Sequence, residues 1–491
     1  MPDPRGFLRY ERRLPGRRPV PVRIRDWQEV YPVAEDPLVR EQATRCMDCG
    51  IPFCHEGCPL GNRIPDWNDL VRTGAWQPAI EALHATNNFP ELTGRLCPAP
   101  CEAACVLGID GGQPVSIKLV EVEIINRAFE AGWVVPQPVQ PPTGRSAAVV
   151  GSGPAGLAAA QQLARAGHAV TVYERDDAPG GLLRYGIPDF KLEKRHVDAR
   201  LAQLRAEGVA FRTGVEVGVD VSAAQLRATH DAVLLATGAL AGRDLPDPPG
   251  RSLPGVHLAM EHLVPANRVV SGRAGATPVD AAGRHVVIIG GGDTAADCLG
   301  VAHRQGAASV TQLDLYPLPP AERDEGRDPW PTWPWILREY PAHEEGGQRE
   351  FAVAVQEFTG TDRVAAVRIS EVTVEKRDGR RIVTAIPGTD RTLPADLVLL
   401  AIGFDGTEDA PLLSQLGLAR NARGTLDCDP GWQTGADGVF VAGDAHRGAS
   451  LIVWAIAEGR AAAASIHAYL GGAGRLPAPV TPATQPLTSG R

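Results

Sequence analysis

The 491 residues predict an α/β protein in which a helical, cysteine-rich N-terminal domain precedes two Rossmann-like domains. Three observations support this fold class. Seven of the nine cysteines lie before residue 135, among short helical patterns. A proline-rich stretch at residues 134–145 is typical of a linker. From Ser146 onward, apolar strand-like runs alternate with alanine-rich helical patterns, as in parallel α/β units.

The length exceeds what one hydrophobic core supports, so several domains are expected. We expect a helical domain at 1–143, a first Rossmann-like part at 144–250, a second, inserted domain at 251–394, and a return to the first at 395–491. The net charge of −9 argues against a nucleic-acid surface. The arginines between residues 5 and 25 indicate either a solvated arm or a docking arm for a partner protein.

The composition favours the cytoplasm. The first thirty residues show no secretory signal, and no uncharged apolar run reaches the length of a membrane span. The cysteines are odd in number and clustered, which fits a reducing compartment better than a disulfide framework.

The cysteines of the first domain form two sets. The stretch CMDCGIPFCHEGCP, residues 46–59, has the spacing C-x2-C-x4-C-x3-C-P, and a second set at residues 97–105 has C-x3-C-x3-C. Zinc sites need four ligands, usually from two paired halves, so seven cysteines serve two zinc sites poorly and zinc is the weaker alternative. Two [4Fe–4S] clusters need eight ligands, which leaves one position for a residue other than cysteine.

In bacterial ferredoxins, the cysteine before proline ligates the other cluster, and this precedent predicts a crossed arrangement. The first cluster would take Cys46, Cys49, Cys54 and Cys105. The second would take Cys58, Cys97, Cys101 and an eighth ligand, for which Glu121 is the first choice and Gln113 and Glu123 are weaker ones. A carboxylate ligand would give this cluster a low potential. Cys298 and Cys428 are expected to be small packed residues without a metal role.

The first Rossmann-like unit contains a glycine turn directly after an apolar strand. Gly151, Gly153 and Gly156 give G-x-G-x-x-G, with Pro154 and Ala155 between them, and the following helix offers its N-terminus to a pyrophosphate. Glu174, followed by Arg175, ends the next strand, where a carboxylate can bind ribose hydroxyls.

Three further stretches of this zone favour FAD as the first nucleotide. They are PGGLLRYGIP at 179–188, AVLLATGA at 232–239 and GVFVAGDA at 438–445, the last followed by a long apolar helical pattern. An aspartate at the last strand end can bind the ribityl and pyrophosphate region, and the helix N-terminus can stabilise negative charge on a reduced flavin. The candidate residues are Gly181, Leu182, Thr237, Gly238, Gly443, Asp444, Ser450 and Leu451. Because they come from both ends of the α/β zone, the FAD domain should be discontinuous.

The inserted unit carries G-x-G-x-x-A, typical of a nicotinamide dinucleotide site. Its candidate residues are Gly290, Gly292, Asp293, Thr294 and Ala295. Asp314, at the end of the next strand, favours NADH by the ribose rule, whereas Arg304, Arg323 or Arg327 could pair with the 2′-phosphate of NADPH. These residues leave the choice open. The Pro/Trp-rich segment 316–350 is expected to be a long excursion, either a surface loop or a lid or docking surface.

Together, the stretches GFLRYERRLPGRRPV, GSGPAGLAAA, GGLLRYGIPDFKLEK, GGGDTAADC, AIGFDG and VAGDAHRGASLIVWAIAEGR and both cysteine sets resemble the small (beta) subunit family of bacterial glutamate synthase. The N-terminal part of dihydropyrimidine dehydrogenase is more distantly similar. The resemblance implies a subunit that passes hydride from NADPH to FAD, then single electrons through its clusters to the large (alpha) subunit. There glutamate is made from 2-oxoglutarate and glutamine. It also implies the crossed ligand scheme, a non-cysteine ligand at Glu121, and NADPH in spite of Asp314.

No general acid or base is expected, because hydride and electron transfer need positioning rather than protonation by the protein. One alternative is a stand-alone NAD(P)H:acceptor oxidoreductase that delivers electrons to ferredoxin. Another is an assembly subunit that keeps the fold without redox work; the intact glycine turns and cysteine sets argue against it.

Overall fold

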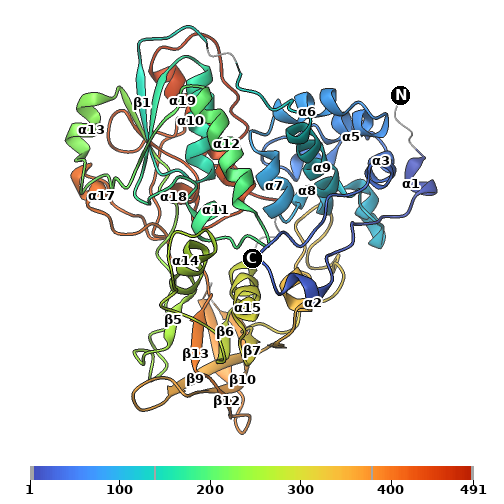
Figure 1. Cartoon of the computed structure of the whole chain (residues 1–491), viewed down its shortest axis with the longest axis vertical. Coiled ribbons are helices and arrows are strands. Elements are labelled where there is room, and N and C mark those ends of the chain that lie inside the picture. The colour runs from blue at the N-terminus through green and yellow to red at the C-terminus, as the bar shows by residue number, and fades with distance from the viewer. Residues whose placement is uncertain (1–4, 138–139, 378–379, 488–491) are drawn as a thin grey trace.

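The computed structural model describes residues 5–137, 140–377 and 380–487. Figure 1 shows a helical N-terminal part beside two α/β parts, of which the second lies below the first. The predicted fold class, a helical domain followed by parallel α/β domains, is confirmed.

Short helices build the N-terminal part. They are α1 (Gly6–Arg9), α2 (Val20–Arg23), α3 (Asp36–Thr44), α4 (Phe53–Glu56), α5 (Ile64–Arg72), α6 (Trp76–His84), α7 (Pro90–Leu96), α8 (Pro100–Ala103), the 3-10 helix η1 (Val106–Gly111) and α9 (Ile117–Glu130). Several begin with proline in the first turn, where the missing N–H costs no helical hydrogen bond. Trp67, Phe89 and Ile124 are fully buried between these helices.

The first α/β part is a parallel sheet of strand order β14-β4-β1-β2-β3. Its strands are β1 (Ser146–Val150), β2 (Ala169–Glu174), β3 (Ala210–Thr213), β4 (Ala232–Leu235) and β14 (Val439–Val441). Its helices are α10 (Pro154–Arg165), α11 (Leu182–Tyr185), α12 (Lys194–Ala206), α13 (Ala223–Thr229), α17 (Pro411–Gln415), α18 (Asp444–Arg447) and α19 (Ile452–Tyr469). Because β14 pairs with β4, this sheet contains strands from both ends of the α/β zone.

Helix α19 is the longest helix of the described residues and packs against α10 in the core, where Gly459 approaches Ala155. Among the residues that the structure describes, no helix is both long and apolar enough to cross a membrane.

The second α/β part is a parallel sheet of order β5-β13-β6-β7-β8. Its strands are β5 (Val256–Leu258), β6 (His285–Ile289), β7 (Ser309–Leu313), β8 (Gln348–Glu350) and β13 (Leu397–Leu400), with helices α14 (Ala259–Val270), α15 (Asp293–Gln305) and α16 (Pro341–Glu344). The boundary expected between residues 394 and 395 is wrong in one respect. Strand β13 pairs with β5 and β6, so the second domain extends at least to Leu400.

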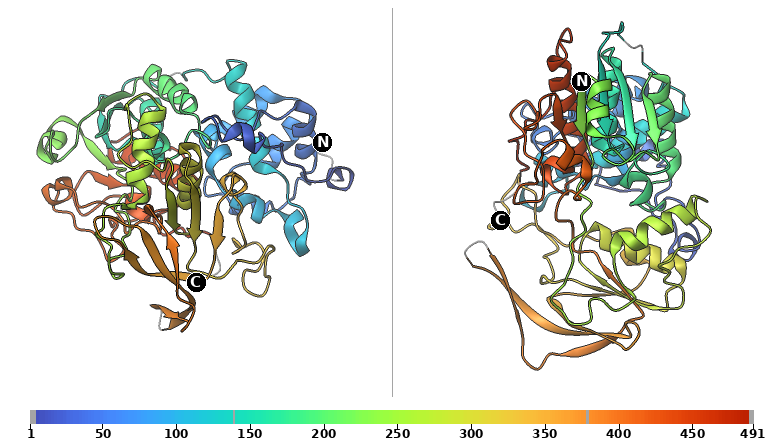
Figure 2. Two further views of the ribbon diagram at one scale, coloured as in Figure 1. Left: turned by 60° about the horizontal axis from the view of Figure 1, so that its bottom comes forward. Right: turned by 90° about the vertical axis from the view of Figure 1, so that its left-hand side faces the viewer.

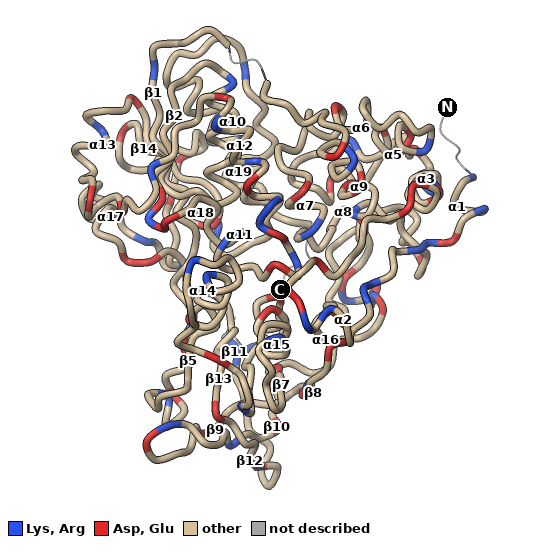
Figure 3. The backbone as a smooth tube through the Cα atoms, viewed as in Figure 1, with Lys and Arg blue, Asp and Glu red and all other residues tan. Residues whose placement is uncertain are grey.

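An antiparallel extension is attached to this second part. It consists of β9 (Val353–Thr359), β10 (Ala366–Arg377), β11 (Arg380–Ala385) and β12 (Arg391–Pro394). Figure 2 shows the β10–β11 hairpin projecting away from the three-part body. Lysine, arginine and acidic residues are interspersed over all parts of the chain (Figure 3).

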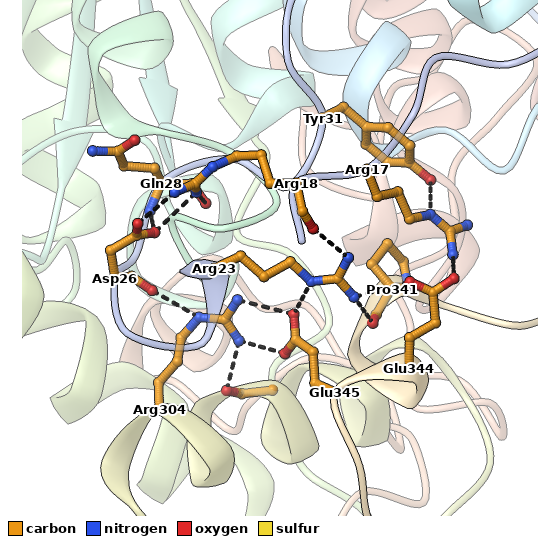
Figure 4. A network of polar contacts seen from close by, with 11 residues as sticks. Arg17, Arg18, Arg23, Asp26, Gln28, Tyr31, Arg304, Pro341, Glu344 and Glu345 are labelled. Atoms are coloured by element: carbon orange, nitrogen blue, oxygen red, sulfur yellow. Dashed lines mark hydrogen bonds and ion pairs between the residues drawn. The ribbon is translucent and has the colours of Figure 1, made fainter. Parts of the chain in front are cut away.

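The N-terminal arm, residues 10–33, lies against both α/β parts rather than free in solvent. Its Glu29 carboxylate accepts hydrogen bonds from Arg95 Nε at 2.7 and 2.9 Å and contacts His196 Nε2 at 3.4 Å. Burial alone would raise the pKa of Glu29, but the contact with His196 and the charge of Arg95 lower it to about 2. Farther along the arm, Arg23 binds Glu345 of the second α/β part (Figure 4).

The Pro/Trp-rich excursion reaches back to the N-terminal part. Trp330 packs on Phe53 with ring centroids 4.7 Å apart, and its indole N–H donates to the Cys105 carbonyl at 3.2 Å. Arg323 donates to the Ala103 carbonyl at 2.9 Å. The end of the excursion forms α16 and β8, so it completes the edge of the second sheet.

Candidate functional site

The eight predicted ligands lie in two groups around two neighbouring cavities of the N-terminal part. The outer cavity is lined by Cys46, Cys49, Cys54 and Cys105. The inner cavity is lined by Cys58, Cys97, Cys101 and Glu121. Ile64 and Ile117 line both cavities, so the two are adjacent. This is the grouping that the crossed scheme predicts.

The crossing arises from the packing of α4 against α8. Cys58 follows α4 but lines the inner cavity with Cys97 and Cys101. Cys105 follows α8 but lines the outer cavity with the three cysteines of the first set. Gly57 permits the close approach, since a Cβ there would lie 2.8 Å from the Pro100 carbonyl oxygen. Any side chain at position 57 would therefore push the two helices apart.

The cavities suit clusters better than single ions. Among the residues described, no three His, Cys, Asp or Glu side chains converge as one metal ion requires. The donors are instead spread around each cavity, and thiolates with one carboxylate are suitable ligands for iron. Burial raises the pKa of the Cys58 thiol to about 11 and that of Cys97 to about 12. The thiolates that ligate iron would thus depend on the positive charge of the iron itself.

Glu121 is a buried carboxylate held by neutral groups. It accepts hydrogen bonds from Asn87 Nδ2 at 2.9 Å and from the Thr93 hydroxyl. Burial raises its pKa to about 7, against the hydrogen bond of Thr93 and the charge of Lys118. The weaker candidates for the eighth ligand bind elsewhere: Gln113 accepts from the Arg12 N–H and Glu123 from the Ala34 N–H.

A cavity of about 560 Å³ lies at the carboxyl ends of the first sheet. This volume is within the usual range of cofactor sites, roughly 300–1,000 Å³. The predicted FAD residues that line it are Gly151, Gly153, Pro154, Ala155, Glu174, Arg175, Gly181, Leu182, Thr237, Gly238, Asp444, Ser450 and Leu451. Gly156 and Gly443 do not line it; they lie behind the lining, where Gly156 packs against Gly151 and Gly443 against Ala155.

The glycine turn at Gly151 fits a dinucleotide for physical reasons. Gly151 has φ +102°, and a Cβ there would lie 2.3 Å from the Ala236 carbonyl oxygen, so only glycine suits the position. Glu174 is buried and accepts hydrogen bonds from the backbone N–H and hydroxyl of Ser152, which orient its carboxylate. A turn followed by a helix N-terminus, with this carboxylate beside it, fits the pyrophosphate and ribose of FAD.

Asp444 lies at the far side of this cavity, at the start of α18. Its carboxylate accepts a hydrogen bond from the Ser450 hydroxyl at 2.8 Å. Burial raises the pKa of Asp444 to about 7, opposed by the hydrogen bonds from Ser450.

The helix that follows the second glycine turn begins at the same cavity. Gly290 and Gly292 connect β6 to α15, Ala295 is buried in α15, and Asp293 and Thr294 line the flavin cavity. Lys191, from the first α/β part, contacts Asp293 at 3.3 Å and Asp297 at 2.8 Å. The nicotinamide unit is thereby fixed with its helix N-terminus toward the flavin unit.

Two of the arginines considered for the 2′-phosphate are already engaged. Arg304 is buried and binds Glu345 together with the Asp26 carbonyl (Figure 4). Arg323 donates to the carbonyls of Asp328, Thr332 and Ala103. The alternative that Arg304 or Arg323 pairs with the phosphate is therefore not supported, because the described contacts use their guanidinium groups to connect parts of the fold.

Comparison with known proteins identifies the family of this chain. The description "Pyridine nucleotide-disulphide oxidoreductase" matches residues 145–459, and "Dihydropyrimidine dehydrogenase domain II, 4Fe-4S cluster" matches residues 23–133. The glutamate synthase [NADPH] small chain of Mycobacterium tuberculosis is 61% identical over 99% of this chain and 100% of its own length. The chain belongs to the glutamate synthase small-chain family.

Other members and neighbours agree with this family. The small chain of Bacillus subtilis is 44% identical over 97% of this chain and 100% of its own. Glutamate synthase [NADH] of Schizosaccharomyces pombe is 44% identical over 96% of this chain, which matches 23% of that longer protein. The structure of FprA from Mycobacterium tuberculosis in complex with NADPH shares the fold, with a TM-score of 0.52 and 22% identity over 68% of this chain and 86% of its own. The predicted family and cofactor classes, FAD, a nicotinamide dinucleotide and 4Fe–4S, are confirmed.

Some residues of the site were not predicted from the sequence. Leu96 and Pro98, on either side of Cys97, line the flavin cavity, so the N-terminal part closes one of its walls. The only sign in the sequence that Leu96 and Pro98 belong to a site is their position beside Cys97, a candidate cluster ligand. Ser152, between the first two glycines, and Lys191 carried no such signal.

Proposed function

We propose that this chain is the electron-input subunit of a glutamate synthase. It oxidises NADPH and delivers electrons, through FAD and two [4Fe–4S] clusters, to a large (alpha) subunit that makes L-glutamate from 2-oxoglutarate and glutamine. The observation that carries the proposal is the order of the sites in space. The start of α15, directly after the second glycine turn, lines the flavin cavity. Leu96 and Pro98 line that cavity too, and Cys97 between them lines the inner cysteine cavity. Ile64 and Ile117 line both the inner cavity and the outer one.

When bound, FAD accepts a hydride and releases electrons singly, and [4Fe–4S] clusters carry one electron at a time. The chain's own residues supply binding and orientation. The turn at Gly151 and Gly153 would bind the pyrophosphate of FAD, and Glu174 its ribose. Gly290 and Gly292, at the start of α15, would bind the pyrophosphate of NADPH.

The two sets of cysteines would hold the two clusters. Cys46, Cys49, Cys54 and Cys105 would bind the outer cluster, and Cys58, Cys97 and Cys101 with Glu121 the inner one. We assign no general acid or base, since none is needed.

A large subunit is proposed as the partner of this chain. In support, the Schizosaccharomyces pombe relative has more than three quarters of its length outside the matched region. We place the pair in the cytoplasm, in keeping with unpaired cysteines at the cluster sites.

Anaerobic purification tests the proposal. We expect one FAD and about eight irons per chain, flavin bleaching on titration with NADPH, and co-purification with a large amidotransferase subunit. Iron near four per chain would contradict the two-cluster assignment. A lone chain that reduces ferredoxin rapidly and binds no large subunit would favour the stand-alone oxidoreductase instead.

A further inference from the structure

Two side chains of opposite charge lie at the ribose end of the second glycine turn. Asp314 follows β7, and its carboxylate lies across the turn: a Cβ on Gly291 would be 1.8 Å from Asp314 Oδ2. In Rossmann-like units, the acidic residue at this strand end accepts the ribose 2′-hydroxyl of NADH. Asp314 is therefore placed to bind the adenosine ribose.

Arg349 is brought beside Asp314 by the neighbouring strand. In the parallel pairing of β7 with β8, Arg349 is the partner of Gln312, and the Asp314 N–H donates to the Glu350 carbonyl at 2.7 Å. Paired residues of adjacent strands project from the same face of a sheet, and so do residues two apart. Arg349 therefore shares a face with Gln312 and Asp314.

The guanidinium of Arg349 is available for a ligand. Within the described ranges it forms no hydrogen bond or ion pair, and it lies over the Phe351 ring at 5.0 Å. Burial lowers its pKa, against the charges of Asp314 and Glu339. A half-buried cation without a hydrogen-bonded anion is a favourable partner for phosphate.

We propose that Asp314 and Arg349 form the coenzyme-selectivity site, in which Arg349 binds the 2′-phosphate of NADPH and Asp314 accepts the 2′-hydroxyl of NADH. This rests on the proposed function, in which the second glycine turn binds a nicotinamide dinucleotide. The chain then prefers NADPH, because an arginine–phosphate pair is stronger than a hydroxyl–carboxylate bond. The carboxylate beside the phosphate limits that preference, so NADH is also accepted.

Binding of coenzyme fragments tests the proposal without turnover. The anaerobically purified full-length protein, loaded with flavin and clusters, is titrated calorimetrically with 2′,5′-ADP and with ADP. Arg349→Gln should weaken 2′,5′-ADP about 10- to 100-fold and leave ADP within about twofold. Asp314→Asn should act in the opposite sense, tightening 2′,5′-ADP and weakening ADP. Retained ADP binding by the arginine variant shows that it is folded.

Arg381→Gln is the matched control, because this arginine donates to the phenol of Tyr316, two residues after Asp314, and has no part in the proposed site. It removes the same charge and should change either affinity by less than about twofold. Equal weakening by the two arginine variants, or no change with Arg349→Gln, would overturn the selectivity site while the dinucleotide site stands. If the unaltered protein binds neither fragment, the proposed function fails as well.

Discussion

Replacement of Glu345 by glutamine should release the N-terminal arm from the second α/β part. Glu345 accepts a hydrogen bond from Arg23 Nε at 2.8 Å and two from Arg304, at 2.6 and 3.0 Å (Figure 4). The Arg23 and Arg304 side chains are each 1% exposed and that of Glu345 is 0% exposed. One buried carboxylate thus serves two buried guanidinium groups, one from the arm and one from α15.

The magnitude follows from this burial. Glu345→Gln preserves the shape of the side chain. It leaves the buried Arg304 without its carboxylate partner, and it leaves Arg23 with only the exposed carboxylate of Glu344. Loss of one partner from a buried ion pair typically costs about 3–5 kcal/mol. Because tenfold in an equilibrium constant is about 1.4 kcal/mol, the arm should open about 10²- to 4 × 10³-fold more often.

Native-state hydrogen exchange measures this opening in the intact protein. Amides of residues 18–30 should exchange about 10²- to 4 × 10³-fold faster in Glu345→Gln, while amides of the first sheet should be unaffected. Glu344→Gln is the matched control: its carboxylate also binds Arg17 and Arg23, but the side chain is 43% exposed. An exposed pair contributes up to about 1 kcal/mol, so its effect should be below about tenfold. Similar exchange in the two variants would refute the argument from burial.

Three other outcomes are expected. The pKa of Glu29 is lowered from 4.5 to about 2, so its contribution of about 3 kcal/mol is complete above pH 4.5 and is lost as the pH falls toward 2. Peptic cleavage of the arm should thus be faster in Glu29→Gln than in the unaltered protein at pH 4, and this difference should shrink near pH 2; a constant difference would contradict the assignment. Cys58→Ala should remove about four irons per chain and Cys428→Ala none, measured by iron analysis, and equal iron in both would exclude Cys58 as a ligand. Trp330→Leu should expose the outer cavity, so absorbance of the outer cluster should bleach faster in air than in the control Trp333→Leu, whereas equal bleaching would assign Trp330 no shielding role.

The grouping of the cysteines could be anticipated because it depends on local spacing. Cys58 follows Cys54 by four residues and precedes a proline, and this position predicts that it ligates a different cluster from the cysteines before it. In the structure Cys58 lines the inner cavity. The choice of Glu121 followed from counting donors downstream, and it lies on the face of α9 that lines the inner cavity. These features need little knowledge of tertiary packing.

The domain boundary and the arginines depended on tertiary packing and were misjudged for that reason. The apolar run LVLL at Leu397–Leu400 would fit either sheet, and nothing local shows that it pairs with β5 and β6. The sequence shows only the charge of Arg304, whereas its burial against Glu345 is a long-range property. The sequence gives no signal for Arg349, since a strand of three residues at the end of an irregular excursion leaves no periodic pattern.

The order of the two cysteine cavities relative to the flavin cavity is fixed by the covalent chain. Leu96 and Pro98 line the flavin cavity, and Cys97 between them lines the inner cavity. The two cavities therefore lie on either side of the same short segment of backbone. Within the described part of the chain, neither cysteine cavity shares a lining residue with the flavin cavity, but only the inner cavity has a ligand candidate, Cys97, that is bonded in the chain to residues of the flavin cavity. In the proposed function, electrons would thus pass the carboxylate-containing site first. The outer cavity, with Cys49 only half-buried, is then the one from which a partner would receive them.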